Sequence, residues 1–259
     1  MSNRRALVTG GSRGLGRAIV EALAGEGMDV WAIARDAKRL DLLKQEVRGV
    51  QTRASDAALP QTAAETLREI DPDILVLNAG ATPLTLPVHE LTWEQFSLVW
   101  DTDVKATFHF GKEALTMPMK PGSVVVIISS TAAIGGSPLG GSYAGAKRMQ
   151  WFLAQYFQQE ADRLDLGIRF VALIPPLIGT TDLGRIAVSA SAARQGITEE
   201  AFLDRFGEML TPEAVGRAVV SLVSDSTHKD GIAYRVTGQG LESLPSPGRQ
   251  IPEPDPERA

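Results

Sequence analysis

Short apolar segments alternate along the chain with longer segments of helical periodicity. The apolar segments are rich in valine and isoleucine and lack strict polar–apolar alternation, which is typical of parallel strands covered on both faces. We predict strands at 6–8, 29–34, 73–80, 123–130, 168–174 and 232–238. We predict helices at 15–26, 37–48, 60–70, 90–116, 142–165, 197–210 and 211–224, the last with Thr211 as N-cap and Pro212 in its first turn.

This strand–helix alternation predicts right-handed βαβ units. The expected fold class is α/β, with a doubly wound, Rossmann-like parallel sheet in a three-layer α/β/α arrangement. No break in composition indicates a second domain, so residues 1–243 are expected to form a single domain. Residues 244–259 are rich in proline and charge, and are expected to drape over the domain or to be disordered.

Composition excludes several classes of function. The 259 residues contain no cysteine, which rules out thiol catalysis, disulfides and thiolate metal sites. The three histidines are scattered without metal-ligand spacing, so no metal site is expected. The net charge is −5, and no Lys/Arg cluster is longer than a pair, so no nucleic-acid partner is expected. The start of the chain lacks an apolar signal core, and no apolar run approaches the ~18 residues that span a bilayer; we expect a cytoplasmic protein without a membrane partner.

The segment TGGSRGLG, residues 9–16, follows the first predicted strand and opens the first predicted helix. Gly10, Gly14 and Gly16 allow the backbone to approach a ligand closely, and the start of a helix attracts an anion. Because ligands bind at the carboxyl ends of the strands in such sheets, the segment predicts a pyrophosphate site. A plain tight turn is the alternative. No Lys-Ser/Thr follows, which excludes a phosphate loop of the NTPase type.

The end of the second predicted strand favours NADP(H) over NAD(H). An acid that binds the ribose 2′-hydroxyl is expected about 20 residues after the glycines, but Ala34 and Arg35 stand there. The absent acid also argues against a methyltransferase that uses S-adenosylmethionine. Arg35 and Arg13 would favour a 2′-phosphate, because guanidinium groups bind phosphate oxygens bidentately. Two alternatives remain: Arg35 is a solvated residue at a helix start, or Asp36 binds the ribose instead.

Tyr143 and Lys147 are four residues apart and share one face of a predicted helix. Ser130 ends the preceding strand, so strand and helix can bring the two hydroxyls together at one sheet edge. Tyrosine is a poor acid–base group near neutral pH, and a nearby ammonium favours its phenolate form. These residues suit hydride transfer to a carbonyl, with Tyr143 as general acid/base, Lys147 activating it and holding ribose hydroxyls, and Ser130 polarising the carbonyl oxygen.

On these motifs the chain resembles the short-chain dehydrogenase/reductase family over nearly its whole length. The motifs TGGSRGLG (9–16), LNAG (77–80), SS…Y…K (129–147) and IPPLIGTTDL (174–183) occur in the family's order and spacing. The resemblance implies a nicotinamide-dependent oxidoreductase acting on a small-molecule ketone or secondary alcohol, with Ser130, Tyr143 and Lys147 as catalytic residues. Together with the inferences above, the expected cofactor contacts are Gly10, Ser12, Arg13, Gly14, Leu15, Gly16, Arg35, Asp56, Asn78, Ala79, Gly80, Tyr143, Lys147, Pro175, Ile178 and Thr180, although the segment around Asp56 aligns in two ways.

Three residues depart from the family pattern. Asp103 stands at the position of an asparagine in the catalytic set, while Pro176 and Ala106 replace glycines. Asp103 either is a tolerated variant that still holds the water that the asparagine would hold, or is ionised near Lys147. An ionised Asp103 would weaken the effect of Lys147 on Tyr143 or form an additional ion pair. Asp103 and Pro176 keep open a second function, that of a non-catalytic NADP(H)-binding regulatory or scaffold protein. The third possible function is that of an epimerase or dehydratase with a tightly held cofactor.

The resemblance also implies a substrate lid at about 182–210 and an oligomer. Within the lid, SASAARQG (189–196) is expected to be mobile. The apolar residues Phe202, Phe206, Met209 and Leu210 indicate either a hydrophobic substrate or a helix packed on the core. Helices such as 90–116 and 142–165 pair between subunits in the family, so a homodimer or homotetramer is expected.

Overall fold

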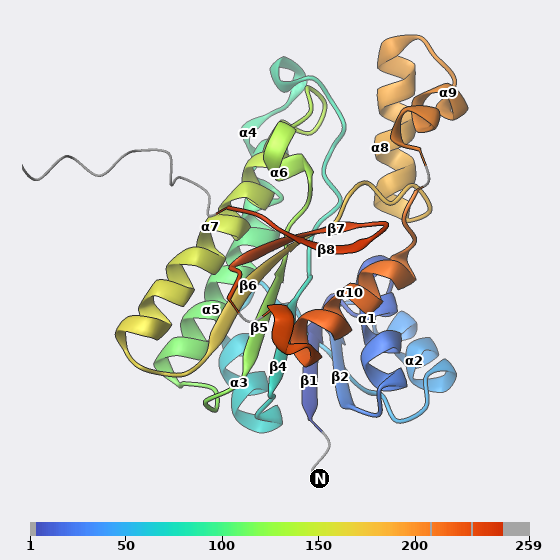
Figure 1. The fold of residues 1–259 in the computed structure, drawn as a ribbon. Coiled ribbons are helices and arrows are strands. Elements are labelled where there is room, and N and C mark those ends of the chain that lie inside the picture. The colour runs from blue at the N-terminus through green and yellow to red at the C-terminus, as the bar shows by residue number, and fades with distance from the viewer. Residues whose placement is uncertain (1–3, 208, 229, 246–259) are drawn as a thin grey trace, which may run out of the picture.

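Eight strands of the described residues join one sheet. The computed structural model describes residues 4–207, 209–228 and 230–245. The strand order is β3-β2-β1-β4-β5-β6-β7-β8, so the direction of winding reverses between β1 and β4 (Figure 1). The strands are β1 (Arg5–Thr9), β2 (Asp29–Ala34), β3 (Gln51–Ala54), β4 (Ile74–Leu77), β5 (Val124–Ile128), β6 (Arg169–Ile174), β7 (Ala233–Thr237) and β8 (Gly240–Ser243).

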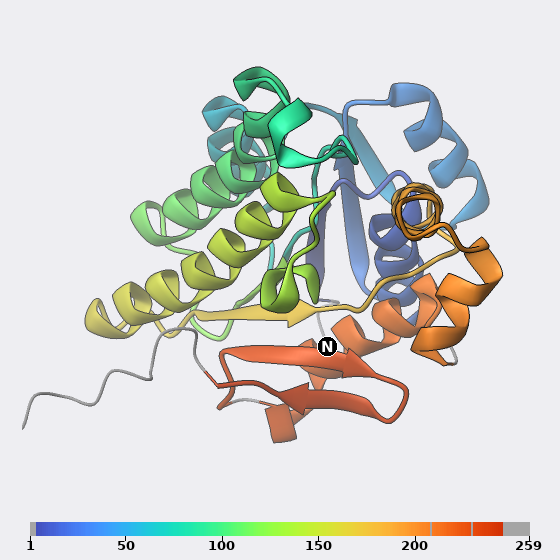
Figure 2. The same ribbon diagram turned by 90° about the horizontal axis from the view of Figure 1, so that it is seen from above.

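Helices cover both faces of this sheet, which confirms the predicted three-layer, doubly wound fold. Helices α1 (Gly14–Gly25), α2 (Ala37–Glu46) and α10 (Pro212–Ser224) bury one apolar cluster against the sheet. Helices α3 (Pro60–Ile70), α5 (Lys105–Thr116) and α7 (Gly141–Arg163) bury a second cluster on the other face. Figure 2 shows the sheet between these two groups of helices.

The central strands are buried along their whole length. Every residue of β4 and of β5 is buried, which explains why their sequences show no polar–apolar alternation. Helix α10 begins as predicted, because the Thr211 side chain accepts a hydrogen bond from the Ala214 N–H and Pro212 occupies the first turn.

The predicted helix over 90–116 is wrong as a single element. A short helix, α4 (Trp93–Ser97), begins with a capping box in which Thr92 and Gln95 exchange hydrogen bonds. A π-helical turn, η2 (Trp100–Val104), then separates α4 from α5. Such turns add one residue to a helical turn and occur frequently at functional sites. The apolar periodicity continues through the π-turn, so the sequence pattern did not indicate it.

Several short elements were not predicted. Strand β3 is a polar edge strand. Strand β8 is the edge strand on the opposite side and pairs with β7 in antiparallel orientation, whereas the other strands of the sheet are parallel. Only two residues separate β7 from β8. A connection this short can join antiparallel strands as a hairpin, whereas parallel strands need a long crossover. The remaining short elements are η1 (Val88–Glu90), α6 (Ala132–Gly135) and η4 (Ser226–His228).

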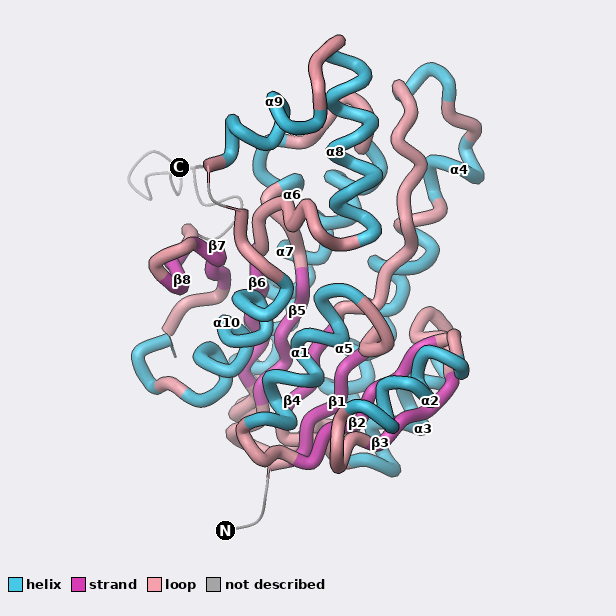
Figure 3. Tube along the Cα trace, turned by 90° about the vertical axis from the view of Figure 1, so that its right-hand side faces the viewer, coloured by secondary structure: helices cyan, strands magenta, loops and turns pink. Residues whose placement is uncertain are grey.

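The segment at 182–210 forms two helices rather than the one predicted at 197–210. Helix α8 (Asp182–Gln195) contains most of the stretch expected to be mobile and ends at Gly196, which has a left-handed conformation. Helix α9 (Glu199–Leu203) and the turn η3 (Asp204–Phe206) follow. Figures 1 and 3 show α4 on one side and α8 with α9 on the other, all beyond the carboxyl end of the sheet.

Little of the predicted tail at 244–259 is described. The N–H of Leu244 donates to the carbonyl of Ala233, and its side chain packs against the core. Residues 246–259 lie outside the described residues. Among the described helices, none combines the length and the apolar character needed to cross a membrane.

The contact between α5 and α7 depends on Gly111. A β-carbon at this position would lie 2.1 Å from Cε2 of Phe157, whose ring packs on Phe170. Gly111→Ala is therefore expected to lower the free energy of unfolding by about 1–3 kcal/mol, as overpacking does. Gly25→Ala is the control, because a β-carbon there meets no atom within 4 Å, and it should leave stability unchanged or raise it. Urea unfolding followed by circular dichroism measures both, and equal effects of the two variants would contradict this account.

Candidate functional site

A cleft of about 730 Å³ lies at the carboxyl ends of the central strands, next to the point where the winding of the sheet reverses. This is the place where doubly wound sheets bind ligands, and its size suits a small-molecule ligand. Residues from the glycine-rich turn, from the ends of β2, β4 and β5, and from α7 and the start of α8 line it.

The glycine-rich turn has a backbone that only glycine permits. Gly10 and Gly14 have positive φ angles of 67° and 54°. A β-carbon on Gly16 would lie 2.1 Å from the carbonyl oxygen of Gly10 and 2.5 Å from Nδ2 of Asn78. At Gly14 it would meet no atom within 4 Å. The backbone is thus packed tightly on the protein side and open on the side of the cleft.

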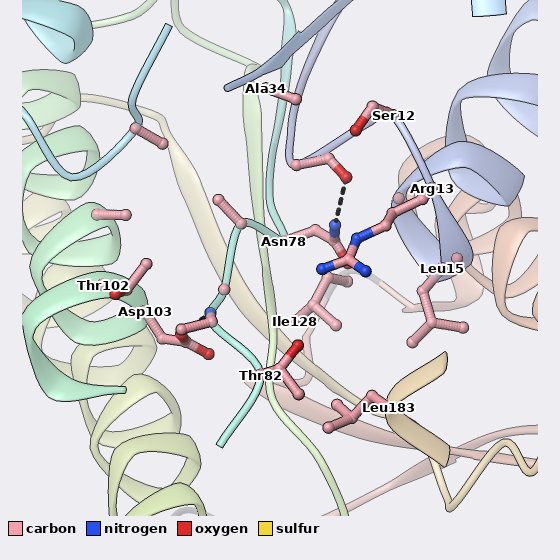
Figure 4. A pocket seen from close by; sticks show the side chains of 18 of the residues that line it. Ser12, Arg13, Leu15, Ala34, Asn78, Thr82, Thr102, Asp103, Ile128 and Leu183 are labelled. Atoms are coloured by element: carbon pink, nitrogen blue, oxygen red, sulfur yellow. Dashed lines mark hydrogen bonds between the residues drawn. The ribbon is translucent and has the colours of Figure 1, made fainter. Parts of the chain in front are cut away.

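Asn78, which follows β4, supports this turn. Its Nδ2 donates to the carbonyl oxygens of Thr9 and Gly10, each at 3.2 Å. The Thr9 hydroxyl in turn accepts from the N–H groups of Asn78 and Ala79. In Figure 4, Asn78 lies between Arg13 on one side of the cleft and Asp103 on the other.

Two arginines lie at the start of α1 and after the end of β2, at one end of the cleft. Arg13 precedes the first turn of α1 and lies 3.3 Å from the Asp182 carboxylate at the start of α8. Arg35 is exposed and lines the cleft. Asp36, the alternative ribose ligand, caps α2 by accepting from the Arg39 N–H and also pairs with the Arg39 guanidinium. Both contacts tie the Asp36 carboxylate to the first turn of α2.

Two serines at the end of β5 have different surroundings. Ser129 is buried, and its hydroxyl donates to the carbonyl of Lys147, which ties β5 to α7. Ser130 is half-buried, and its Oγ accepts from the N–H of Ala132. On α7, the Lys147 ammonium lies 5.5 Å from the centre of the Tyr143 ring. Strand β5 and helix α7 are thereby joined at the end of the sheet that faces the cleft.

Asp103 and Lys147 form a buried ion pair. Oδ2 of Asp103 lies 3.1 Å from Nζ of Lys147, and the two side chains are 1% and 6% exposed. Oδ1 of Asp103 accepts from the N–H of Ala81 at 2.8 Å. A β-carbon on Gly80 would lie 2.6 Å from the same carboxylate, so glycine at the end of β4 leaves the space that Asp103 occupies. The ion pair with Lys147, one of the sequence-based alternatives for Asp103, is present in the structure.

Burial and pairing act in opposite directions on this pair. Burial raises the pKa of the Asp103 carboxyl, and the Lys147 ammonium with the Ala81 N–H counteracts part of that rise. For Lys147, burial is the largest single effect and favours the neutral amine, but the Asp103 carboxylate and Tyr143 together outweigh it, so the pKa of Lys147 is raised. Lys147 therefore stays charged, and Asp103 is the member of the pair that acid would protonate.

Two polar residues of this network were missed at the level of sequence. Gln150 accepts from the Lys147 ammonium at 2.9 Å, and its Nε2 donates to the Thr107 hydroxyl at 2.7 Å. Both side chains are buried. Gln150 follows Lys147 by three residues and Thr107 follows Asp103 by four, so the signal was a polar residue within the buried stripe of each helix.

Most of the predicted site residues line the cleft, and three do not. Ser130, Pro175 and Ile178 are outside its lining, and Ile178 is only 4% exposed and packs in the core. The predicted residues that line the cleft are Gly10, Ser12, Arg13, Gly14, Leu15, Gly16, Arg35, Asp56, Asn78, Ala79, Gly80, Asp103, Tyr143, Lys147 and Thr180. Within the described residues, no group of three or more His, Asp or Glu side chains is placed to hold a metal ion.

The apolar residues predicted for the lid are divided between packing and exposure. Phe202 is buried against Val188 and Ala192 of α8 in a small cluster of its own. Leu210 packs against the main core, whereas Phe206 is half exposed. This favours packing over substrate contact for Phe202 and Leu210. Asp182 and Leu183, at the start of α8, line the cleft.

Together these features suit an elongated anionic ligand. An open helix start beside Arg13 fits a pyrophosphate, and the cleft continues from there to Tyr143 and Lys147. The residues present therefore fit a nicotinamide dinucleotide, with its phosphates at the turn and a ribose near α7.

Comparisons with known proteins agree with this geometry. A family model described as short chain dehydrogenase matches residues 4–190. The chain is 28% identical to L-xylulose reductase of Bos taurus over 228 residues, which are 87% of this chain and 91% of that protein. It is 31% identical to an NADPH-dependent pterin aldehyde reductase of Arabidopsis thaliana over 189 residues, 68% of this chain and 76% of that protein.

Solved structures share the fold at lower sequence identity. A variant of actinorhodin polyketide ketoreductase with NADPH is similar with a TM-score of 0.80 and 22% identity, over 91% of this chain and 96% of that one. The 3-ketoacyl-(acyl-carrier-protein) reductase of Brucella melitensis, complexed with NADH, has a TM-score of 0.74 and 21% identity, over 90% and 96% of the two chains.

Removal of one partner should show that the Asp103–Lys147 pair is charged. Lys147→Met leaves a buried carboxylate without its partner, and we expect a loss of about 3–5 kcal/mol of unfolding free energy near neutral pH. Burial raises the pKa of Asp103, and in the wild type the Lys147 ammonium counteracts part of that rise. Without Lys147 the pKa of Asp103 rises further, so the folded variant binds a proton more tightly than either the unfolded chain or the folded wild type. The loss should therefore shrink as the pH is lowered toward about 5.

Urea unfolding of Lys147→Met and of the wild type across this pH range measures the effect. The double variant Lys147→Met/Asp103→Asn is the control, because it removes the buried charge and should recover most of the lost stability. A loss that is independent of pH, with no recovery in the double variant, would contradict a charged pair.

Proposed function

Because this chain belongs to the short-chain dehydrogenase family, we propose that it transfers a hydride between NADP(H) and a small-molecule ketone or secondary alcohol. One continuous cleft supports this most directly. It joins the glycine-rich turn, which suits a pyrophosphate, to Tyr143 and Lys147, which suit proton transfer at a carbonyl. Bound cofactor supplies or accepts the hydride, and the side chains of this chain supply the proton and the orientation.

Tyr143 is the proposed general acid/base. In the direction of reduction, its hydroxyl gives a proton to the carbonyl oxygen; in the direction of oxidation, it takes one from the alcohol. The Lys147 ammonium, 5.5 Å from the tyrosine ring, stabilises the phenolate that proton donation leaves. Lys147 is also the proposed ligand of the ribose hydroxyls next to the nicotinamide.

Ser130 is the proposed donor to the substrate oxygen. Its Oγ accepts the Ala132 N–H, so its own O–H proton is free for a second hydrogen bond. Ser130 lies outside the lining of the cleft. This role therefore requires a movement of the α6 segment, or a position of the substrate, that brings the substrate oxygen to the Ser130 hydroxyl. Asp103 is proposed to act through Lys147, by holding the ammonium in place.

The preference for NADP(H) is proposed from charge at the adenosine end. Arg13 and Arg35 line the cleft there, and Asp36 is occupied as the cap of α2. Guanidinium groups suit a 2′-phosphate. Names of relatives support both cofactors, since one reductase is NADPH-dependent and one similar structure holds NADH.

The segment at about 182–210 is the proposed substrate lid. Its first residues line the cleft, and the Arg13–Asp182 ion pair links it to the glycine-rich turn. We propose that cofactor and substrate are bound within one domain, residues 1–243. The exposed side chains of Phe108 on α5 and Tyr156 on α7 support a homodimer or homotetramer that pairs through these helices.

Tyr143→Phe tests the proposed chemistry. The variant keeps the ring but loses the proton, and we expect turnover to fall by roughly 10²–10⁴-fold while NADPH binding is retained. The measurement is NADPH oxidation at 340 nm against a panel of aldehydes and ketones, with binding followed by fluorescence titration. Unchanged turnover would contradict the role of Tyr143. NADPH binding without oxidation by the wild type on any carbonyl would favour the non-catalytic alternative.

Arg35→Ser tests the cofactor preference. Loss of a charge-assisted hydrogen bond to the 2′-phosphate is expected to raise the dissociation constant of NADPH by roughly 10–100-fold. The dissociation constant of NADH, which lacks this phosphate, should change little. Lys38→Ser, three residues further on in the first turn of α2 and outside the lining of the cleft, is the control for a simple loss of positive charge. An equal loss of affinity for both cofactors in Arg35→Ser would contradict the assignment.

A further inference from the structure

The ammonium of Lys147 is surrounded by acceptors from the protein itself. Besides the Asp103 carboxylate at 3.1 Å, the Gln150 side-chain oxygen lies at 2.9 Å and the Ile128 carbonyl oxygen at 3.2 Å. Lys147 itself is buried. An ammonium has three N–H donors, so these three acceptors match its donors one to one.

The orientation of Gln150 is set by its own contacts. Its Nε2 donates to the Thr107 hydroxyl at 2.7 Å and to the Asp103 carbonyl at 3.3 Å, and the Thr107 hydroxyl donates to the same carbonyl at 2.8 Å. The reverse orientation would place the amide nitrogen against the ammonium and the amide oxygen against a carbonyl. Only the observed orientation pairs each donor with an acceptor, so Gln150 presents its oxygen to Lys147.

This arrangement conflicts with the role proposed for Lys147. A ribose hydroxyl that accepts a hydrogen bond from the ammonium needs a free donor, and three protein acceptors leave none. One acceptor must be exchanged for the ribose when the dinucleotide binds. The energetic cost of that exchange lowers the apparent affinity for the cofactor.

Gln150 is the acceptor best suited to be exchanged. The Asp103 carboxylate carries the opposite charge and is anchored by the Ala81 N–H. The Ile128 carbonyl belongs to the backbone at the end of β5. The Gln150 oxygen is neutral, so giving up its contact costs the ammonium less electrostatic energy than giving up the Asp103 carboxylate. It also belongs to a side chain with rotatable bonds, unlike the Ile128 carbonyl.

We propose that Gln150 is a positioning residue that occupies the third donor of Lys147 and yields it to the cofactor ribose. This inference rests on the proposed function, because it requires a nicotinamide dinucleotide in the cleft. Gln150 would thereby stabilise the buried ammonium before the cofactor arrives, at the expense of cofactor affinity.

Gln150→Met tests this inference through a change of affinity in an unusual direction. Methionine has a similar length and no strong acceptor, and Thr107 keeps its bond to the Asp103 carbonyl. The ribose then meets a free donor, and we expect the dissociation constant of NADPH to fall by roughly 3–10-fold, since less than one full charge-assisted hydrogen bond is gained. Fluorescence titration of the purified protein measures this without any need for turnover.

Two further variants separate positioning from a general effect on the helix. Gln158→Met, also on α7, removes an amide that bonds the N–H of Phe170 and the carbonyl of Ile168, away from Lys147, and should leave the dissociation constant unchanged. Thr107→Val removes the hydroxyl that anchors the Gln150 amide, and should tighten binding by a smaller factor. If Gln150→Met does not fold, the dissociation constant of NADPH for Thr107→Val tests the inference instead.

The outcomes separate this inference from the proposed function. Tighter NADPH binding in Gln150→Met or Thr107→Val, with unchanged binding in Gln158→Met, supports it. Unchanged or weaker binding in the folded variants, alongside normal binding in the wild type, overturns it and leaves the proposed function standing. A wild type that binds neither NADPH nor NADH overturns both.

Discussion

The buried ion pair between Asp103 and Lys147 is the interaction on which the site depends. It joins the π-helical turn η2 to α7. The Asp103 carboxylate also accepts a hydrogen bond from the N–H of Ala81, in the segment that follows β4. Neither charge could remain buried alone, because an unpaired ion in a protein interior costs several kcal/mol. The pair therefore requires that η2, β4 and α7 meet at one point, which lies beside the cleft. The ammonium is held at that point as a fixed positive charge next to Tyr143.

The sheet places this charge opposite the glycine-rich turn. The carboxyl ends of β1 and β4 lie side by side, so Asn78 after β4 can support the turn after β1. Glycine at positions 16 and 80 leaves room for Asn78 and for the Asp103 carboxylate respectively. The same two strand ends thus shape both halves of the cleft. A ligand that bridges the halves must be long and anionic at one end, which describes a dinucleotide.

Sequence patterns predicted the sheet, its helical layers and most residues of the cleft, because these depend on periodicity and on motifs with strict backbone demands. They failed where packing overrides periodicity. The π-turn that carries Asp103 interrupts an apolar pattern that reads as one helix, and β3 is too polar to be recognised as a strand. Asp103 was noticed as a departure from the family pattern, but its pairing with Lys147 was only one of several alternatives. Gln150 and Thr107 were missed because their importance comes from contacts between different helices.

A crystal structure of the protein with NADP⁺ tests the central claim most directly, namely that the cleft joins a pyrophosphate site to the charged Lys147. The account predicts the pyrophosphate at the start of α1 over Gly14. It also predicts a ribose hydroxyl within hydrogen-bonding distance of the Lys147 ammonium, with the contact between Asp103 and Lys147 intact. A dinucleotide bound with its pyrophosphate away from α1, or with both riboses out of reach of Lys147 and Tyr143, would contradict it.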